Sequence, residues 1–318
     1  MNFLFTIIVK RTGFALLTLF VISVLIFAGL EALPGDTAQA ILGQGATQEN
    51  LTALRKELKL DLPLHTRYVS WLGDLARGNL GNSLSNGRPV AGMIGWRFEN
   101  TLILAFSAAA VSIPLAIVLG LICALYQNSW LDKFLSISTL SAISLPEFFV
   151  AYLLILVFAV QFELFPSAAT LRPDMAFLDI INVLVLPCLT MTLVVLAHMM
   201  RMTRAAIIGV LSSPYIEMAR LKGVKQAKII FYHALPNALA PIINVVVMDL
   251  AWLVVGVVVV EVVFVYPGLG QLLVDSVSKR DIPVVQAAGL IFACTYIFLN
   301  MTADVLSILS NPKLRHAK

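Results

Sequence analysis

The chain has 318 residues, of which 59% are hydrophobic and only 13% are charged, and its formal net charge is +4. Soluble globular proteins carry about 25% charged residues, so this composition excludes a water-soluble globular domain and places most of the chain in lipid. The sequence contains no long block of basic residues. We therefore expect the positive charge to reflect the excess of basic residues on the cytoplasmic side of membrane proteins, and not binding to nucleic acid.

Apolar segments long enough to cross about 30 Å of hydrocarbon as helices recur along the chain. The six segments are residues 12–30, 101–126, 134–162, 181–200, 238–265 and 284–309. The first is too long for a secretory signal and lacks a cleavage motif, so we expect a retained span. Pro114 and Pro146 fall inside the second and third segments, where membrane helices tolerate proline if neighbouring groups satisfy the freed carbonyls. The predicted fold class is an all-α integral membrane protein with six transmembrane helices.

Lysine and arginine in the short loops predict that the N- and C-termini are cytoplasmic. The cytoplasmic basic residues are then Lys10, Arg11, Lys133, Arg201, Arg204, Arg220, Lys222, Lys225, Lys228, Lys313, Arg315 and Lys318. The short outer loops carry only Arg172, Lys279 and Arg280. The predicted domains are the N-terminus with the first span (1–30), an external segment (31–98), and a five-helix core (99–318).

The external segment carries two amphipathic stretches and is expected to be folded. Leu51, Leu54 and Leu58 form an i, i+3, i+7 apolar stripe. Tyr68 and Trp71 belong to the second stretch, which follows Pro63. A folded periplasmic subdomain between the first two spans follows from these patterns.

The loop 205–236 is too polar to span a membrane and is patterned as short helices. Ser213 is a candidate N-cap with Pro214 at the first helical position, and Gly223 suits the left-handed residue that ends a helix. A second segment leads to Pro236, which is expected to end it and to start the fifth span. From these residues alone, the loop fits either an amphipathic helix on the inner leaflet or a plug for a cytoplasmic protein.

Glu217, Met218, Ala219 and Gly223, followed by Leu235 and Pro236, resemble the E-A-A-x3-G coupling loop of ATP-binding-cassette (ABC) importer permeases. Met218, the middle residue of this triplet, replaces the first alanine of the pattern, and His233 stands at a usual isoleucine. Further matching motifs lie at 33–36, 60–64, 78–83, 261–264, 266–270 and 311–315, so that the resemblance to the oligopeptide/dipeptide/nickel branch covers nearly the whole chain. Glu99 stands where that branch usually has proline, which affects only where the second span begins.

This resemblance implies a multi-pass inner-membrane permease that forms half of a translocation pathway and is not itself an enzyme. It implies a second permease, two cytoplasmic ATPases that bind ATP and Mg, and a periplasmic or lipid-anchored binding protein as partners. The same residues, Glu217, Met218, Ala219, Gly223, Leu235 and Pro236, would then contact an ATPase. Peptides are the expected solutes, and nickel chelates, glutathione, opines and oligosaccharides are the alternatives within the branch.

Asp249 and Glu261 are the acidic residues inside the fifth span, where ionised groups tend to face a cavity or a partner. Asp249 is the stronger candidate for the translocation pathway, because Glu261 lies in a motif near the end of the span. No metalloprotease or serine-hydrolase motif occurs, so no catalytic or metal site is predicted. An ion-driven secondary carrier is the alternative from another class, but no clear internal repeat supports it.

Overall fold

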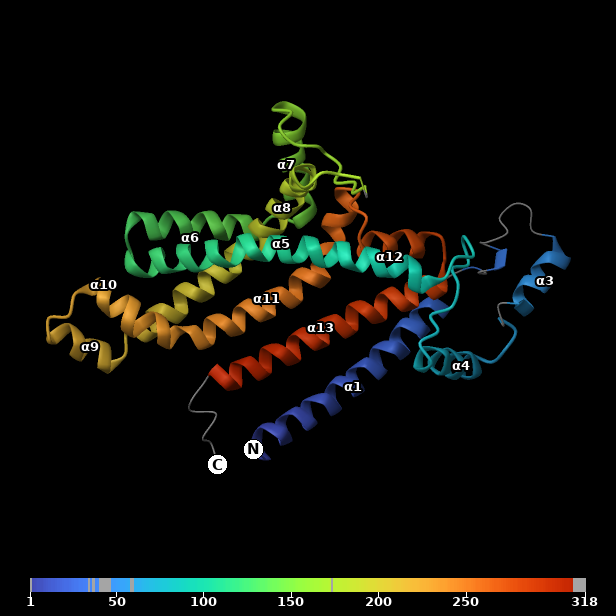
Figure 1. The fold of residues 1–318 in the computed structure, drawn as a ribbon, viewed down its shortest axis with the longest axis horizontal. Helices are drawn as coiled ribbons and strands as arrows, with labels where there is room; N and C mark the ends of the chain where they lie inside the picture. Colours follow the sequence, from blue (N-terminus) through green and yellow to red (C-terminus); the bar gives the residue numbers. More distant parts are fainter. Residues whose placement is uncertain are drawn as a thin grey trace. The chain divides into compact units, whose positions relative to one another are not determined.

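The computed structural model describes residues 2–33, 35, 38–39, 47–57, 60–172 and 174–310. The motif residues Pro34, Asp36 and Leu58 and the segment 311–315 lie outside this range, as do Lys313, Arg315 and Lys318. The described chain is helical, and its only strand-like pairing is an isolated bridge between Asn82 and Pro89. The prediction of an all-α fold is confirmed (Figure 1).

The helices follow one another in a single series along the chain. They are α1 (Asn2–Glu31), α3 (Gln48–Glu57), α4 (Leu64–Ala76), α5 (Val90–Leu125), α6 (Trp130–Ile143), α7 (Glu147–Leu154), η2 (Ile155–Gln161), α8 (Phe177–Leu211), α9 (Pro214–Leu221), α10 (Gln226–Lys228), η3 (Ile229–Ala234), α11 (Leu235–Val263), α12 (Leu269–Ser278) and α13 (Ile282–Ser310). The η segments have π-helical geometry. The chain divides into a first unit, residues 1–101 and 267–294, and a second unit, residues 102–266 and 295–318.

Five described helices are long and apolar enough to cross a membrane, and a bent helix pair supplies the sixth span. The six-span prediction is therefore confirmed. The second span begins at Val90, well before the predicted residue 101. Val90 and Ile94 are buried one helical turn apart, so the charged residues that follow them lie on a continuous helix and do not form a loop.

The third span is broken, contrary to the expectation that Pro146 lies within one helix. α6 ends at Ile143 and α7 begins after Pro146, with a bend of 104° between the two parts (Figure 1). Proline lacks an N–H and disfavours helical geometry at the residue before it, here Leu145. The hydroxyl of Ser144 donates to the Leu140 carbonyl at 2.9 Å and satisfies one acceptor in the last turn of α6. Pro114, in contrast, lies inside the continuous α5 as predicted.

The first unit contains a folded segment between α1 and α5, as predicted. Phe27 of α1 packs against Tyr68 and Trp71 of α4, with ring centroids 5.3 and 6.1 Å apart. Arg67 of α4 forms an ion pair with Glu31 at the end of α1, at 2.6 Å. The aromatic side chains of α4 therefore pack on α1, and these contacts together with the ion pair stabilise the helix pair.

A buried carboxylate ties the loop after α4 to the start of α13. Asp281, 1% exposed, accepts hydrogen bonds from the Leu84 N–H at 2.9 Å and from the Ser85 hydroxyl at 2.9 Å. The Ser83 hydroxyl also donates to this carboxylate. Buried charges are stable when they are satisfied in this way, so Asp281 determines the conformation of the loop.

The second unit is built around α8, which packs against α6, α7 and α11. Its main core includes Leu186, Met191 and Met199 of α8 and Leu253 and Val257 of α11, all fully buried. A smaller core at the end of α8 joins Ile207 to Ala238 and Ile242 of α11. α8 and α11 therefore pack together at both ends of the region that carries the predicted site residues.

Candidate functional site

The helix α9 begins where the sequence predicts, although its first turn is capped differently. Ser213 occupies the N-cap position and Pro214 lies in the first turn. The Ser213 hydroxyl donates back to the Val210 carbonyl at the end of α8 and does not cap α9. The expected side-chain cap is therefore wrong, and this serine instead links α8 to the turn before α9.

Gly223 ends α9 in the predicted way. Its φ is +73°, in the left-handed region that glycine adopts most readily. The Gly223 N–H donates to the Arg220 carbonyl at 2.9 Å, and the Val224 N–H donates to the Ala219 carbonyl at 3.1 Å. These two bonds form a Schellman motif, which closes the helix and fixes the direction in which the chain leaves it.

The two faces of α9 differ sharply in exposure. Ile216 is fully buried and holds the helix to the rest of the second unit. Met218 and Leu221 lie on the other side and are 54% and 77% exposed. Glu217 is also exposed there, while Ala219 is partly buried. The coupling residues predicted on α9 thus present an apolar surface edged by a carboxylate, which is typical of an interaction site.

Pro236 does not separate the loop from the fifth span. The prediction that it ends the preceding helix is wrong, because η3 continues directly into α11 and Ile229–Val263 form one span-length helix. Pro236 does lie in the first turn of α11, where the sequence predicts that the fifth span starts. A π-helical segment shifts the hydrogen-bond register, which accommodates the missing N–H and the ring of the proline. The Asn237 side chain donates to the His233 carbonyl at 2.7 Å, while Leu235 is partly buried beside Pro236.

α9 rests on this continuous helix. It packs against η3, and the Tyr215 hydroxyl lies 3.4 Å from the His233 carbonyl. α8 leads into α9 through two serines, and α11 leads away from η3, so both long helices meet at α9 (Figure 1). A displacement of α9 would therefore act on α8 and α11 together.

Asp249 lies on α11 and is paired with His198 of α8. Its carboxylate oxygens are 3.0 and 3.3 Å from His198 Nδ1, and the residue is 8% exposed. The pair links the two helices that meet at α9. Sequence spacing could not reveal this contact, because it depends on how α8 packs against α11.

Glu261, the second acidic residue predicted in the fifth span, is fully buried near the end of α11 and lies apart from Asp249. The two are twelve residues apart on one helix, which corresponds to about 18 Å. The Glu261 carbonyl accepts a hydrogen bond from the Tyr266 N–H at 2.8 Å, within a turn where Val265 has φ +52°. Glu261 and Asp249 therefore do not form one site.

The sequence interpretation missed an ion pair between α6 and α8. Arg204 binds both carboxylate oxygens of Asp132, with Nε and Nη2 each at 2.7 Å. The Asn128 N–H donates to the same carboxylate at 2.9 Å. Asp132 is only 3% exposed, so the pair is largely withdrawn from solvent. In the sequence, Arg204 was counted only for the charge of its loop, and Asp132 was not singled out.

A cavity of about 720 Å³ adjoins this ion pair. We name it the basic cavity; its lining includes Lys133, Ser136 and Ile137 of α6 and His198, Arg201 and Arg204 of α8. Among the described residues, Lys133 and Arg201 have no ion-pair partner. The cavity therefore carries uncompensated positive charge.

Glu147, at the break in the third span, was also missed. Its Oε1 is buried and has no hydrogen-bond partner within the described part of the chain. A carboxylate without a partner is unusual in apolar surroundings and costs free energy when it is ionised. The preceding Pro146 places it at the first position of α7.

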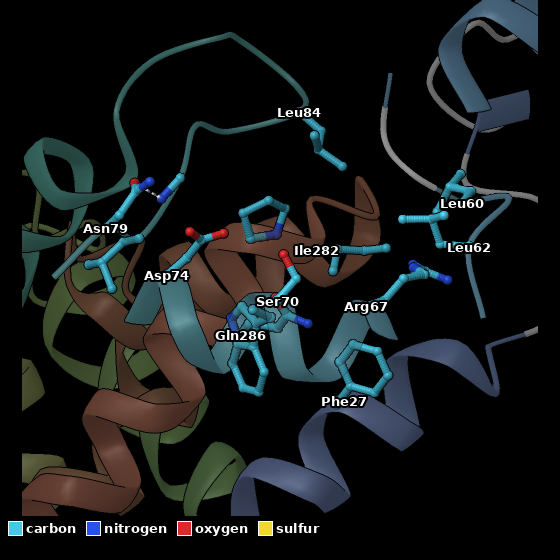
Figure 2. A pocket seen from close by; sticks show the side chains of 14 residues that line it. Phe27, Leu60, Leu62, Arg67, Ser70, Asp74, Asn79, Leu84, Ile282 and Gln286 are labelled. Atoms are coloured by element: carbon cyan, nitrogen blue, oxygen red, sulfur yellow. Dashed lines mark hydrogen bonds between the residues drawn. The ribbon is translucent and has the colours of Figure 1, made fainter. Parts of the chain in front are cut away.

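A smaller cavity of about 250 Å³ lies in the first unit. Phe27 and Trp71 form part of its apolar wall, and Figure 2 shows Ser70 and Asp74 directed into it. The Asn79 side chain holds the adjacent loop by accepting from the Gly81 N–H at 3.0 Å. No group of three or more metal-ligating side chains occurs in the residues that the structure describes.

Comparison with known proteins identifies the family. Residues 116–316 match the model of the binding-protein-dependent transport system inner membrane component, and residues 4–119 match the N-terminal model of such membrane components. The glutathione transport system permease protein GsiC of Escherichia coli strain K12 is 37% identical over 309 residues, which cover 97% of this chain and 98% of that protein. GsiC of Shigella flexneri serotype 5b is 36% identical over the same proportions. The chain therefore belongs to the family of inner-membrane components of binding-protein-dependent transport systems, as a multi-pass permease of an ABC importer.

Proposed function

We propose that this permease forms one half of a translocation pathway and is driven through α9 by a partner ATPase. The observation that carries the proposal is the exposed apolar face of α9 on a helix anchored by Ile216. Met218 and Leu221 expose large apolar side chains in a polar loop, where water alone would not favour them. A groove on a cytoplasmic ATPase would bury this surface, with Glu217 at its edge.

The packing of α9 against η3 supports the transmission of a displacement along η3 and α11, which together we call the lever. Asp249 lies 20 residues after Ile229, so a continuous helix extends about 30 Å from the α9 contact to the His198–Asp249 pair. Because Gly223 fixes the exit of the chain from α9, a push on α9 would move η3 and would not be absorbed by the loop. Leu235 and Pro236 then belong to the helical part of the lever.

Asp249 is the proposed pathway residue, and Glu261 is a second candidate nearer the other end of α11. Asp249 sits between the two helices that α9 would move, so the His198–Asp249 contact would change as the pathway opens. Glu261 is fully buried near the end of α11, and its carbonyl accepts a hydrogen bond from the following turn, which favours a positioning role in this proposal.

The remaining assignments follow the family. We propose cytoplasmic termini, an external segment at 31–98 that faces the binding protein, a core at 99–318 with the coupling loop 205–236, and a second permease as partner. ATP and Mg would bind to two partner ATPases, so hydrolysis would not occur on this chain. Relatives named as glutathione permeases support a small peptide-like solute, glutathione included; nickel chelates, opines and oligosaccharides are the other candidates.

Met218→Asp tests the proposal, because it places a charge on the exposed face of α9 without disturbing a buried contact. We expect the permease to insert and to accumulate normally, while ATPase co-purification and solute import fall at least tenfold. Val69→Asp is the matched control, since Val69 is 66% exposed on α4 and lies outside the loop. Full import by Met218→Asp, with the ATPase still bound, would refute docking through this face.

A further inference from the structure

The basic cavity is lined by two cations without ion-pair partners in the described ranges of the chain, and by an ion pair that joins its two helices. Lys133 projects from the first turns of α6, and Arg201 projects from the last third of α8. Arg204, on the same wall, is already neutralised by Asp132 at 2.7 Å. Lys133 and Arg201 are therefore the groups that remain available to a ligand in the described part of the cavity.

The lining changes in character along the two helices. Lys133, Ser136 and Leu140 follow one another at i, i+3 and i+7 on one face of α6. His198 and Arg201 lie at i and i+3 on α8. The Asp132–Arg204 contact fixes the register of the two helices, so the cations cluster near one end and Leu140 lies farther along the cavity. Such a lining suits a solute with anionic groups and an apolar portion.

The cavity has the size of a small-molecule site. Its volume of about 720 Å³ lies within the range of about 300–1,000 Å³ that is usual for ligand pockets. A tripeptide-sized solute would fit it. Inorganic anions would leave most of it empty.

One residue that lines the basic cavity contacts the proposed pathway residue Asp249. His198 lines the cavity and contacts Asp249 at 3.0 Å. The walls are α6 and α8, and α8 is one of the helices that meet at α9. A solute held in the cavity would therefore be in contact with the element that the ATPase is proposed to move.

We propose that the basic cavity is a solute site of the translocation pathway, in which Lys133 and Arg201 bind the carboxylates of an anionic peptide-like solute. This inference rests on the proposed function and specifies its substrate class. Glutathione, which has two carboxylates, has the required chemistry. In glutathione the ammonium group is on the same carbon as one carboxylate, so a solute bound through that carboxylate to Arg201 would place its ammonium group next to His198, the partner of Asp249.

Equilibrium binding of radiolabelled glutathione to the purified full complex, without binding protein, tests the proposal. Glutathione diethyl ester is the matched probe, since it has the same backbone without carboxylates. Both cations are exposed, so each contributes at most about a fivefold gain in affinity. We expect Lys133→Gln with Arg201→Gln to weaken glutathione binding about twentyfold. We also expect the unmodified complex to bind the ester no more tightly than the double variant binds glutathione.

The charge-matched control is Lys279→Gln with Arg172→Gln, which removes two exposed cations outside the cavity and should leave binding unchanged. Equal binding of glutathione and ester, unchanged binding in the cavity variant, or no binding to the unmodified complex would each overturn the proposal. Displacement of glutathione by phosphatidylglycerol but not phosphatidylcholine would assign the cavity to lipid and overturn it as well. ATPase activity stimulated by the binding protein is measured in parallel. If the cavity variant keeps this activity, a loss of glutathione binding is due to the cavity and not to a failure of coupling through α9.

Discussion

Replacement of Gly223 by alanine or asparagine distinguishes backbone conformation from size at the end of α9. An added Cβ would meet nothing within 4 Å in this chain, so the cost within the permease is conformational and not steric. Alanine in the left-handed region costs about 1–2 kcal/mol, and asparagine costs less because it adopts this region more readily. We therefore expect Gly223→Ala to open the Schellman motif about tenfold more often, and Gly223→Asn to have a smaller effect.

Hydrogen exchange at the Gly223 and Val224 amides measures the opening directly, because both donate to carbonyls of the last turn of α9. Solute imported per ATP hydrolysed measures the consequence, which should fall more for alanine than for asparagine. Gly209→Ala is the matched control, since Gly209 lies inside α8 with open space around it. An equal loss of coupling for alanine and asparagine, with exchange unchanged, would refute the conformational reasoning and would point to contact with the partner.

Substitutions at three further positions or pairs test the packing within each unit. Asp281→Ala should cost about 3 kcal/mol and make the segment around Leu84 sensitive to limited proteolysis, whereas Asp281→Asn should have a smaller effect. Asp132→Ala and Arg204→Ala should each destabilise by about 2 kcal/mol, and a double-mutant cycle should give a coupling of similar size; additive effects would contradict the ion pair. Glu147→Gln should leave the melting temperature unchanged or raised, and a clear drop would show a partner for its buried oxygen.

The spans were predictable because their signal is simple. A run of about 20 apolar residues is required wherever a helix crosses hydrocarbon, whatever surrounds it. The stop at Gly223 was predictable for a similar reason, since a left-handed residue after a helix strongly favours glycine. These features depend on local covalent structure and on the solvent.

The two prolines show where local reasoning fails. Pro146 was expected to lie within a span and instead breaks it, and Pro236 was expected to end a helix and instead lies in one. Both remove the same hydrogen bond, so the outcome depends on the neighbouring backbone. A π-helical segment accommodates Pro236, while a sharp bend after α6 accompanies Pro146.

Contacts between helices were beyond the sequence for a different reason. His198 and Asp249 are 51 positions apart, and Asp132 and Arg204 are 72 apart. Their pairing depends on the packing of α8 against α11 and α6, which no periodicity within one helix specifies. The sequence therefore identified Asp249 as a candidate without its partner.

Cross-linking from α9 to the partner ATPase tests the central claim most directly. Met218→Cys in the assembled complex should form a cross-link to an ATPase subunit through a short reagent that carries one thiol-reactive and one photoreactive group, because the Met218 side chain is 54% exposed on the proposed docking face. Thr66→Cys, exposed on α4 of the predicted external segment, should give none. A cross-link from residue 66 but not from residue 218 would contradict the account of α9 as the coupling helix.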